Sequence, residues 1–319
     1  MKNEKFNFGF VISSLTDYTN ELSRDLVAKA VGKARTLEFI NIRSNIKREE
    51  AINIIDSTIT VAAGGSCGFS SAGDSTYSQV MLTVDQLQVL EQLCAEQLED
   101  KWVGMYMKPG SYQDELPFAE QWIAEKVDKV GKIIDTIMWQ GNKASGSGNL
   151  ALSNGFLKVA SDATGTVDVT TTASSFTAAN IIATVDAAVD AIPADARDMS
   201  DLTLFVSRSV FDTYVRACRN ANYFHFNPEE MVNGVATIPG TNVRIVATVG
   251  LAGATTGSPA YPQYLLAPAS YLYFGTDLVS DYAGFDGWYS KDNQAFRIAM
   301  KWKQGVAIAF PEFVVKNFA

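Results

Sequence analysis

Residues 133–158, IIDTIMWQGNKASGSGNLALSNGFLK, decide how the fold of this 319-residue chain is interpreted. The stretch begins as a helix that carries Trp139 and stops at Gly141. Small and polar residues follow, and order resumes at Gly155. Glycine after a helix commonly adopts the left-handed conformation that terminates it. We therefore predict a left-handed helix end at Gly141 and a loop.

The glycines of this loop do not have the pattern of a phosphate-binding loop. Such a loop has the spacing GxxxxGK[ST] between a strand and a helix, so that N–H groups at the helix N-terminus face the anion. Here the glycines follow a helix, Lys143 precedes the later ones, and neither GK[ST] nor GxGxxG occurs. The residues alone leave open a hinge between domains or a plain helix–loop–strand connection.

The segment before this loop is the longest predicted helix, from Asp114 to Trp139, about 39 Å at 1.5 Å per residue. Apolar residues recur along it at spacings of four and three, which is typical of one buried seam. The seam consists of Ile123, Val127, Val130, Ile134 and Ile137. A capping box at Thr83-x-x-Gln86 predicts another helix to about Trp102. Its apolar face would contain Leu87, Leu90, Cys94 and Leu98.

Two β-branched runs, Asn53–Val61 and Thr76–Val84, predict a long two-stranded hairpin. Residues 62–75 between them are small and polar except for Phe69. A two-stranded hairpin is marginally stable by itself in water, so it needs a surface to lie on. A predicted helix with a thin apolar stripe, Asp17–Val31, precedes the hairpin. It is predicted to be an arm that also needs a surface to pack on.

The second half of the chain alternates helices and strands and predicts an α/β or α+β lobe. The expected elements are a helix between Thr177 and Pro193, a strand at Leu202–Val206, a helix from Ser207 to Arg219, and strands at Val243–Val249, Tyr264–Leu266 and Tyr271–Phe274. The last residues predict an antiparallel hairpin: Ala295–Lys303, a turn at Gln304-Gly305, then VAIAF and PEFVVKNF.

Composition restricts the classes of function. The chain is 47% hydrophobic, 19% charged and has a formal net charge of −9, without a basic run. This argues against direct nucleic-acid recognition, which needs a basic face. We expect no membrane helix, because no apolar run reaches about 18 residues, and no signal peptide. Three scattered cysteines, Cys67, Cys94 and Cys218, indicate reduced cytoplasmic thiols.

Residues with the spacing of catalytic or metal sites are few. The single histidine, His225, lies among aromatic residues, which favours a packed or surface position over a catalytic one. Two carboxylate pairs, Glu229 with Glu230 and Asp281 with Asp286, are expected to be solvated. Asp281, Asp286 and Asp292 lack the spacing of an EF-hand. We therefore predict no enzyme, no cofactor and no metal.

Two stretches together resemble the major capsid proteins of tailed double-stranded DNA bacteriophages, which have the Hong Kong 97 fold. In that family a spine helix ends in a bulky-x-Gly-Asn/Asp step, and a Gly-Leu/Phe-Leu step follows a variable loop. The matching residues are Trp139, Gly141, Asn142, Gly155, Phe156 and Leu157. The terminal stretch resembles the family's closing strands, with the matching residues Trp302, Pro311, Glu312 and Phe313.

This resemblance implies an α+β fold with an N-terminal arm (1–44), an extended loop (45–84), a peripheral domain with the spine helix (85–175 and 293–319) and an axial α/β domain (176–292). The loop would make inter-subunit contacts through Ile59, Val61, Phe69, Tyr77 and Val80. The 133–158 break would then be the hinge at which the spine helix ends and the chain turns back onto the peripheral β-sheet, with Trp139 anchoring the helix end in the core. No motif for self-crosslinking is found.

The function that the resemblance implies is a coat that self-assembles into the icosahedral or prolate head of a phage. Its partners would be copies of itself in hexamers and pentamers, with possible scaffolding, portal and decoration proteins. Packaged DNA would lie near it without specific contact, no membrane would be involved, and assembly would occur in the host cytoplasm. The alternatives are an encapsulin-like nanocompartment shell, which would hold protein cargo, and an unrelated cytoplasmic α/β enzyme or secreted adhesin.

Overall fold

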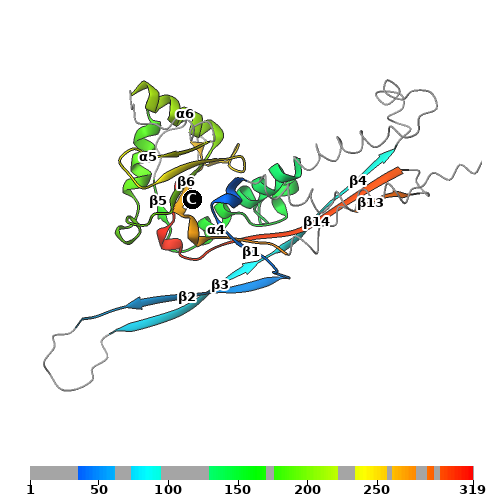
Figure 1. Cartoon of the computed structure of the whole chain (residues 1–319), viewed down its shortest axis with the longest axis horizontal. Helices are drawn as coiled ribbons and strands as arrows, with labels where there is room; N and C mark the ends of the chain where they lie inside the picture. Colours follow the sequence, from blue (N-terminus) through cyan, green and yellow to red (C-terminus); the bar gives the residue numbers. More distant parts are fainter. Residues whose placement is uncertain are drawn as a thin grey trace, which may run out of the picture.

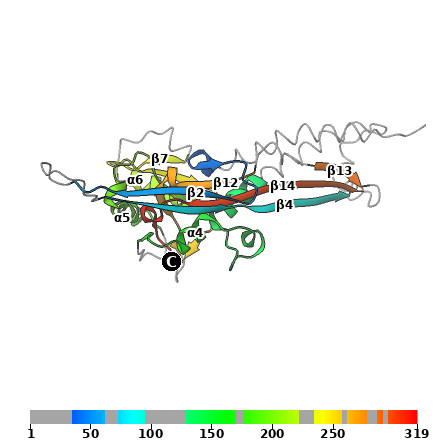
Figure 2. The same ribbon diagram turned by 90° about the horizontal axis from the view of Figure 1, so that it is seen from below.

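The computed structural model describes residues 35–61, 73–94, 129–169, 176–221, 234–256, 261–277, 286–290 and 295–318. These residues form a mixed α+β fold that is long and thin (Figures 1 and 2). A lobe with α5 and α6 lies beside the middle of the molecule. Long strands run from the middle in two directions: β4 and β14 to one side, β2 and β3 to the other. The predicted arm helix at 17–31 lies outside the described residues.

A single 14-residue strand, β14 (Ala295–Ile308), organises the extended part, here called the body. Its last four residues pair with β12 (Leu272–Gly275), and the ten before them pair with β4 (Asp85–Cys94). On its other edge β13 (Asp286–Ser290) pairs with the first five residues, and β1 (Asn41–Arg43) runs parallel to β12. All but the β1–β12 pair are antiparallel.

The predicted turn at Gln304-Gly305 is wrong, because β14 continues straight through both residues. Gly305 instead allows a close approach: a Cβ there would overlap the carbonyl oxygen of Thr83, where β3 crosses β14. The chain then leaves the body through the 3-10 turn η6 (Pro311–Phe313) and joins a different sheet as β15 (Val315–Lys316). Glycine marks a backbone crossing here, and not a reversal of the chain.

The predicted helix from residue 86 is also wrong where the structure describes it, because residues 85–94 form β4. The helical pattern required Leu87 and Leu90 to share one buried face. Leu87 is buried and Leu90 is 60% exposed, as the alternation of a strand requires. A ladder of ten residues with β14 outweighs the local helical preference. Residues 95–102 lie outside the described part of the chain.

The predicted long hairpin is confirmed in its strands. β2 (Glu49–Thr58) and β3 (Asp74–Thr83) pair antiparallel over ten residues, and we call this pair the hairpin. The tip at residues 62–72, with Phe69, lies outside the described residues.

The lobe is built on a six-stranded sheet with the strand order β5-β15-β11-β6-β8-β7. β6 (Leu202–Ser207) lies inside it and is buried along its whole length, because both faces of the sheet are covered. Leu204 and Val206 pack against α5 and α6, while Phe205 joins the core of the body. The other elements are β5 (Val167–Asp168), β7 (Val235–Thr237), β8 (Arg244–Thr248), β11 (Leu265–Pro268), α5 (Ile181–Asp190) and α6 (Arg208–Asn220).

These lobe elements confirm the predicted alternation of helices and strands. Most of their ends lie within one or two residues of the predicted ends. The remaining short elements are η1 (Arg35–Glu38), η3 (Gly148–Ala151), η4 (Ala194–Ala196), η5 (Ala269–Tyr271), β9 (Thr255–Thr256) and β10 (Tyr261–Pro262).

The described part of the predicted long helix covers residues 129–140, and its N-terminal half lies outside the described residues. Together with α4 (Phe156–Asp162) it covers one face of β14. Val130, Ile134 and Met138 of the helix lie in the same core as the apolar residues of that face of the body. The body therefore has two layers, helices on one face of a narrow sheet.

Replacing Gly305 with alanine tests the crossing. The added Cβ has no space beside Thr83, so we expect unfolding free energy to fall by about 1–3 kcal/mol, typical of overpacking. Gly148→Ala is the control. Gly148 has a φ of +58°, but an added Cβ would meet no atom within 4 Å. The unfolding free energy of this variant should therefore fall by less, about 1 kcal/mol. Urea denaturation of the two variants measures the difference. Equal losses would contradict the close approach.

Candidate functional site: the projecting hairpin and the helix-end junction

The hairpin exposes apolar side chains on the face turned away from the body. Ile55 and Tyr77 are directly opposite each other and are 61% and 76% exposed. Met81 lies on the same face and is 49% exposed. Further along, Ile59 and Val61 are almost fully exposed. A cluster of large exposed apolar residues on a thin element is typical of an interaction surface.

Polar pairs on the same face hold the two strands in register. Asn53 Oδ1 accepts a hydrogen bond of 2.9 Å from Gln79 Nε2, and the hydroxyls of Ser57 and Ser75 are 3.2 Å apart. The Ile55–Tyr77 pair lies between these two pairs along the ladder. The apolar pair is therefore presented from a defined backbone geometry.

The opposite face of the hairpin is buried only at its root. The root cluster consists of Ile46, Ile52, Leu82, Val84 and Ala307, with Val80 and Tyr273 packed against it. Val80, one of the expected inter-subunit residues, is thus half-buried against its own chain. Beyond this cluster the hairpin is exposed. The exposed residues include Asp56 and Thr58 of β2 and residues 74–79 of β3.

A buried carboxylate fixes the polar side of the root. Asp277 follows β12, is 3% exposed, and accepts from Lys47 Nζ at 3.0 Å and from Lys303 Nζ at 2.9 Å. Lys303 Nζ also donates to the carbonyl oxygen of Lys47 at 2.9 Å. Three segments far apart in sequence are joined here, so the direction of the hairpin relative to β14 is determined by both apolar and ionic contacts.

The helix-end junction is built around Trp139, which is fully buried. Its ring centroid lies 5.2 Å from that of Phe156 and 5.0 Å from that of Phe205. Its indole Nε1 donates to Thr36 Oγ1 at 2.9 Å, and Thr36 Oγ1 donates to Asp135 Oδ1 at 2.6 Å. Trp139 therefore connects the helix to α4, to the lobe and to the segment that follows the predicted arm.

Glycines allow the backbone to pack tightly around this indole. A Cβ on Gly141 would overlap the carbonyl oxygens of Ile137 and Ser153, and one on Gly155 would overlap the backbone of Trp139. The prediction of a left-handed helix end at Gly141 is wrong, because Gly141 is not among the glycines with positive φ. The residue is glycine because of the close approach of Ser153.

After Gly155 the chain continues as the helix α4, which packs on β14, and not as the strand of a plain helix–loop–strand connection. Phe156 and Leu157 are buried on its inner side against the body. Asn142 organises the loop before it: its Oδ1 accepts from the backbone N–H groups of Ala144 and Ser145, and its Nδ2 donates to Ser145 Oγ at 2.7 Å.

The closing residues lie at the contact of body and lobe. Trp302 is half-buried against the core, and its Nε1 donates to Gln304 Oε1 at 3.1 Å. Pro311, Glu312 and Phe313 form the 3-10 turn η6, whose Phe313 packs against the lobe core. At the other end of the sequence, Leu37 and Ile40 of the expected arm are buried in the core of the body.

The sequence reasoning missed Asp135, whose carboxylate is buried at this junction. Its Oδ2 accepts from the backbone N–H of Gly250 at 2.7 Å, in the loop after β8. Gln140 Nε2 donates to the carbonyls of Gly250 and Ala252, at 2.5 and 3.0 Å. A signal was present: an acid four residues before Trp139 lies on the same helical face, which is an unusual place for a charge.

Burial raises the pKa of Asp135 above its usual 3.8, and hydrogen bonds from Thr36, Gly250 and Val249 offset only part of this. The native state therefore binds the proton more tightly than the unfolded chain does. Between 3.8 and the raised native pKa, the native state holds more protons, so stability falls as pH rises. Above the native pKa the full cost of the buried charge is present.

We therefore expect Asp135→Asn to gain stability relative to the wild type as pH rises through this window, and to differ little below it. Urea denaturation of the subunit at a series of pH values measures the difference. Asp195→Asn, at an exposed position, is the control and should show no such trend. A wild type that becomes more stable relative to D135N as pH rises would contradict the raised pKa.

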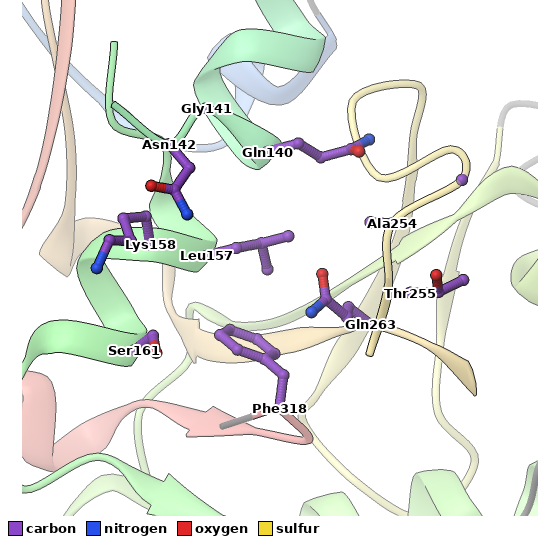
Figure 3. A pocket seen from close by; sticks show the side chains of 11 residues that line it. Gln140, Gly141, Asn142, Leu157, Lys158, Ser161, Ala254, Thr255, Gln263 and Phe318 are labelled. Atoms are coloured by element: carbon purple, nitrogen blue, oxygen red, sulfur yellow. The ribbon is translucent and has the colours of Figure 1, made fainter. Parts of the chain in front are cut away.

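A cavity of about 300 Å³ lies beside the helix end (Figure 3). Gln140, Asn142, Lys158, Gln263 and Phe318 are among the residues that line it. Lys158 forms an ion pair with Asp162 along α4. The lining residues include no histidine, cysteine or carboxylate, so they provide neither an acid–base pair nor a set of metal ligands.

Within the described residues, no group of three or more His, Cys, Asp or Glu side chains could hold a metal ion. No helix in that part of the chain is long and apolar enough to cross a membrane.

Comparison with known proteins shows which fold this is. No family model and no curated protein matches the sequence. Among solved structures, a chain of the satellite phage P4 procapsid, determined with the size determination (Sid) protein, is 14% identical with a TM-score of 0.56. The match covers 92% of this chain and 90% of that one. The chain has a capsid-protein fold.

Two further structures with this capsid fold have comparable similarity. The capsid of Myoviridae phage XM1 is 12% identical with a TM-score of 0.56, covering 89% of this chain and 91% of that one. A virus-like particle from Pyrococcus furiosus is 10% identical with a TM-score of 0.51, covering 93% of this chain and 98% of that one. The capsid fold is thus matched along nearly the whole chain.

Proposed function

We propose that this chain is the major capsid protein of a tailed bacteriophage and assembles into the shell that encloses a double-stranded DNA genome. The observation that supports this best is a capsid fold over nine-tenths of the chain, together with a hairpin that no other described residues cover beyond the root. In Hong Kong 97 terms, the hairpin is the extended loop, the body is the peripheral domain, and the lobe is the axial domain.

The role of such a subunit is mechanical rather than catalytic. Obligate interfaces commonly bury about 2,000–5,000 Å², and the hairpin provides exposed apolar surface for one. Ile59, Val61, Phe69 and Tyr77 would contact neighbouring copies, while Val80 would keep only a part of its surface for them. Trp139, Gly141, Asn142, Gly155, Phe156 and Leu157 would form the hinge at the spine-helix end, and Trp302, Pro311, Glu312 and Phe313 would close the peripheral domain.

The proposed partners are copies of the same chain in hexamers and pentamers, with scaffolding, portal and decoration proteins where the virion has them. A net charge of −9 suits a coat that surrounds DNA without neutralising it. The proposed location is the virion, after assembly in the cytoplasm of a bacterial host.

The second candidate is a nanocompartment shell with the same fold. The observation that favours it is the fold similarity to the virus-like particle from Pyrococcus furiosus. The contents of purified particles separate the two functions. DNA with a portal supports the phage shell, and packed protein supports the compartment. Electron microscopy that finds no particles, combined with turnover of a substrate by the lone subunit, would favour the enzyme alternative.

The double variant I55S/Y77S tests the hairpin as an assembly contact. Both side chains are exposed in the subunit, so the fold should be retained, while assembly should lose apolar burial worth about 1.5–3 kcal/mol per side chain. We expect the critical concentration for assembly to rise at least tenfold, since about 1.4 kcal/mol is a factor of ten. Light scattering and sedimentation measure it.

The matched control is Leu152→Ser, an apolar residue 48% exposed in the loop after the helix end. Its critical concentration for assembly should equal that of the wild type. Wild-type assembly by a folded I55S/Y77S would show that this face of the hairpin meets no neighbour.

A further inference from the structure

Two short turns connect the body with the lobe, and they lie side by side. η5 leads from β11 of the lobe into β12 of the body, and η6 leads from β14 of the body to β15 of the lobe (Figure 1). The backbone N–H of Ala309 donates to the carbonyl oxygen of Tyr271 at 3.0 Å and holds the two turns together. Side chains from both turns therefore contribute to one surface.

Three aromatic residues form the centre of this surface, and we call Tyr271, Phe310 and Phe313 the aromatic patch. The ring centroid of Tyr271 lies 4.7 Å from that of Phe310 and 5.9 Å from that of Phe313. The centroids of the two phenylalanine rings are 6.1 Å apart. Each of the three residues is only half-buried. Large apolar side chains that stay exposed together are typical of an interaction site.

Two carboxylates flank the aromatic patch. Glu312 lies within η6 and is exposed. Asp201 precedes β6, and its Oδ2 accepts from the backbone N–H of Ser270, the neighbour of Tyr271, at 2.9 Å. Burial raises the pKa of the Tyr271 hydroxyl, and the negative charges of Asp201 and Glu312 raise it further. The patch therefore combines aromatic rings with two negative charges.

The described residues provide no cation for these two charges. Among them, neither Glu312 nor Asp201 forms an ion pair, whereas Asp277 and Asp168 each have a lysine partner. Every effect of the described residues on the pKa of Tyr271 raises it, whereas a nearby cation would lower it. The aromatic patch is thus an electronegative surface whose counterion is not among the described side chains.

The next tyrosine along the chain shows what a cation does at such a ring. Tyr273 lies two residues after Tyr271, and the guanidinium carbon of Arg43 lies 5.6 Å from its ring centroid. A cation within about 6 Å of a ring centroid is attracted by the negative face of the ring. Tyr271 adds two carboxylates to the same kind of ring. The same chemistry therefore predicts that a cation from outside the described residues binds here.

The shape and hydration of arginine suit this surface better than those of other cations. Its guanidinium is planar, weakly hydrated and able to stack on aromatic rings, and it pairs with carboxylates through two hydrogen bonds. An ammonium group is compact and strongly hydrated, so it has no flat face to stack. A free small cation would gain little at an exposed surface, because exposed ion pairs are weak. An arginine carried by a polypeptide adds the contacts of its neighbouring residues to the rings.

We propose that the aromatic patch, together with Asp201 and Glu312, is a docking site for an arginine side chain of a separate partner protein. Several arginines of this chain already have partners within it, including Arg43, Arg208 and Arg297, which favours a separate protein over a second copy. The proposal goes beyond the proposed shell function and does not depend on it. A partner bound here would contact both turns and so hold the body and the lobe together at their connection.

Titration of the dilute subunit with short peptides tests the proposal. The probe is the blocked tripeptide Ala-Arg-Ala, and the matched neutral probe has citrulline in place of arginine. Ring signals of Tyr271 and Phe310 in aromatic NMR spectra, assigned with Tyr271→Phe, report binding. We expect the arginine probe to shift these signals in a saturable way, with a Kd about fivefold lower than that of the citrulline probe, the upper end for one exposed ion pair.

Two variants separate the contributions of charge and ring. Glu312→Gln removes one charge at an exposed position, so it should fold normally and weaken arginine binding about two- to fivefold. Phe310→Leu keeps apolar volume but removes one ring, and a similar loss is expected. Glu49→Gln, the same change at an exposed position at the start of β2, is the control and should bind like the wild type. Circular dichroism checks the fold of each variant.

Each alternative result overturns a definite part of the proposal. Equal binding of the arginine and citrulline probes, or wild-type binding by E312Q, would show that the patch is not a cation site. A lysine probe that binds as well as the arginine probe would overturn the assignment to arginine. Self-association of the wild type that is lost in E312Q would assign the patch to a second copy. These measurements use the lone subunit, so failure to form particles would contradict the shell function and leave them unaffected.

Discussion

The crossing of the hairpin over β14 is the contact on which the rest of the architecture depends. Five apolar side chains of the root cluster and the Lys47–Asp277–Lys303 group hold it. Burying a side chain of this kind contributes about 1.5–3 kcal/mol relative to leaving it exposed. This anchors the first part of the ladder, while the distal part of both strands has no second layer among the residues that the structure describes. The hairpin is therefore firmly attached at its root, and beyond the root the described residues do not cover it.

In the helix-end junction, by contrast, the polar side chains of Trp139, Thr36 and Asp135 form hydrogen bonds within the chain. Trp139, Thr36 and Asp135 form one hydrogen-bonded series that joins the helix to the segment before β1, and Gly250 joins it to the lobe. The raised pKa of Asp135 shows that burial of this carboxylate is only partly offset. Such a group lowers stability while it fixes the relative position of three segments.

The sequence predicted the parts of the fold that local chemistry determines. The hairpin strands, the lobe elements and the burial of Trp139 all follow from side-chain pattern and size. It failed where a long-range contact determines the conformation. Leu87 and Leu90 fit a helix until the ten-residue ladder with β14 forms, and Gly305 has the properties of a turn until β3 crosses it. The burial of Asp135 and Asp277 could not be predicted, because it depends on contacts between distant segments: Thr36 lies 99 residues from Asp135, and Lys47 lies 230 residues from Asp277.

The distal hairpin should become protected only when a second copy covers it. Hydrogen exchange of the β2 and β3 amides, measured on dilute subunits and on assembled particles, tests this most directly. Amides at the root, near Ile52 and Leu82, should exchange slowly in both states, while those near Ile55 and Tyr77 should exchange rapidly in subunits and slowly in particles. Equal protection of the distal amides in lone subunits would contradict the account.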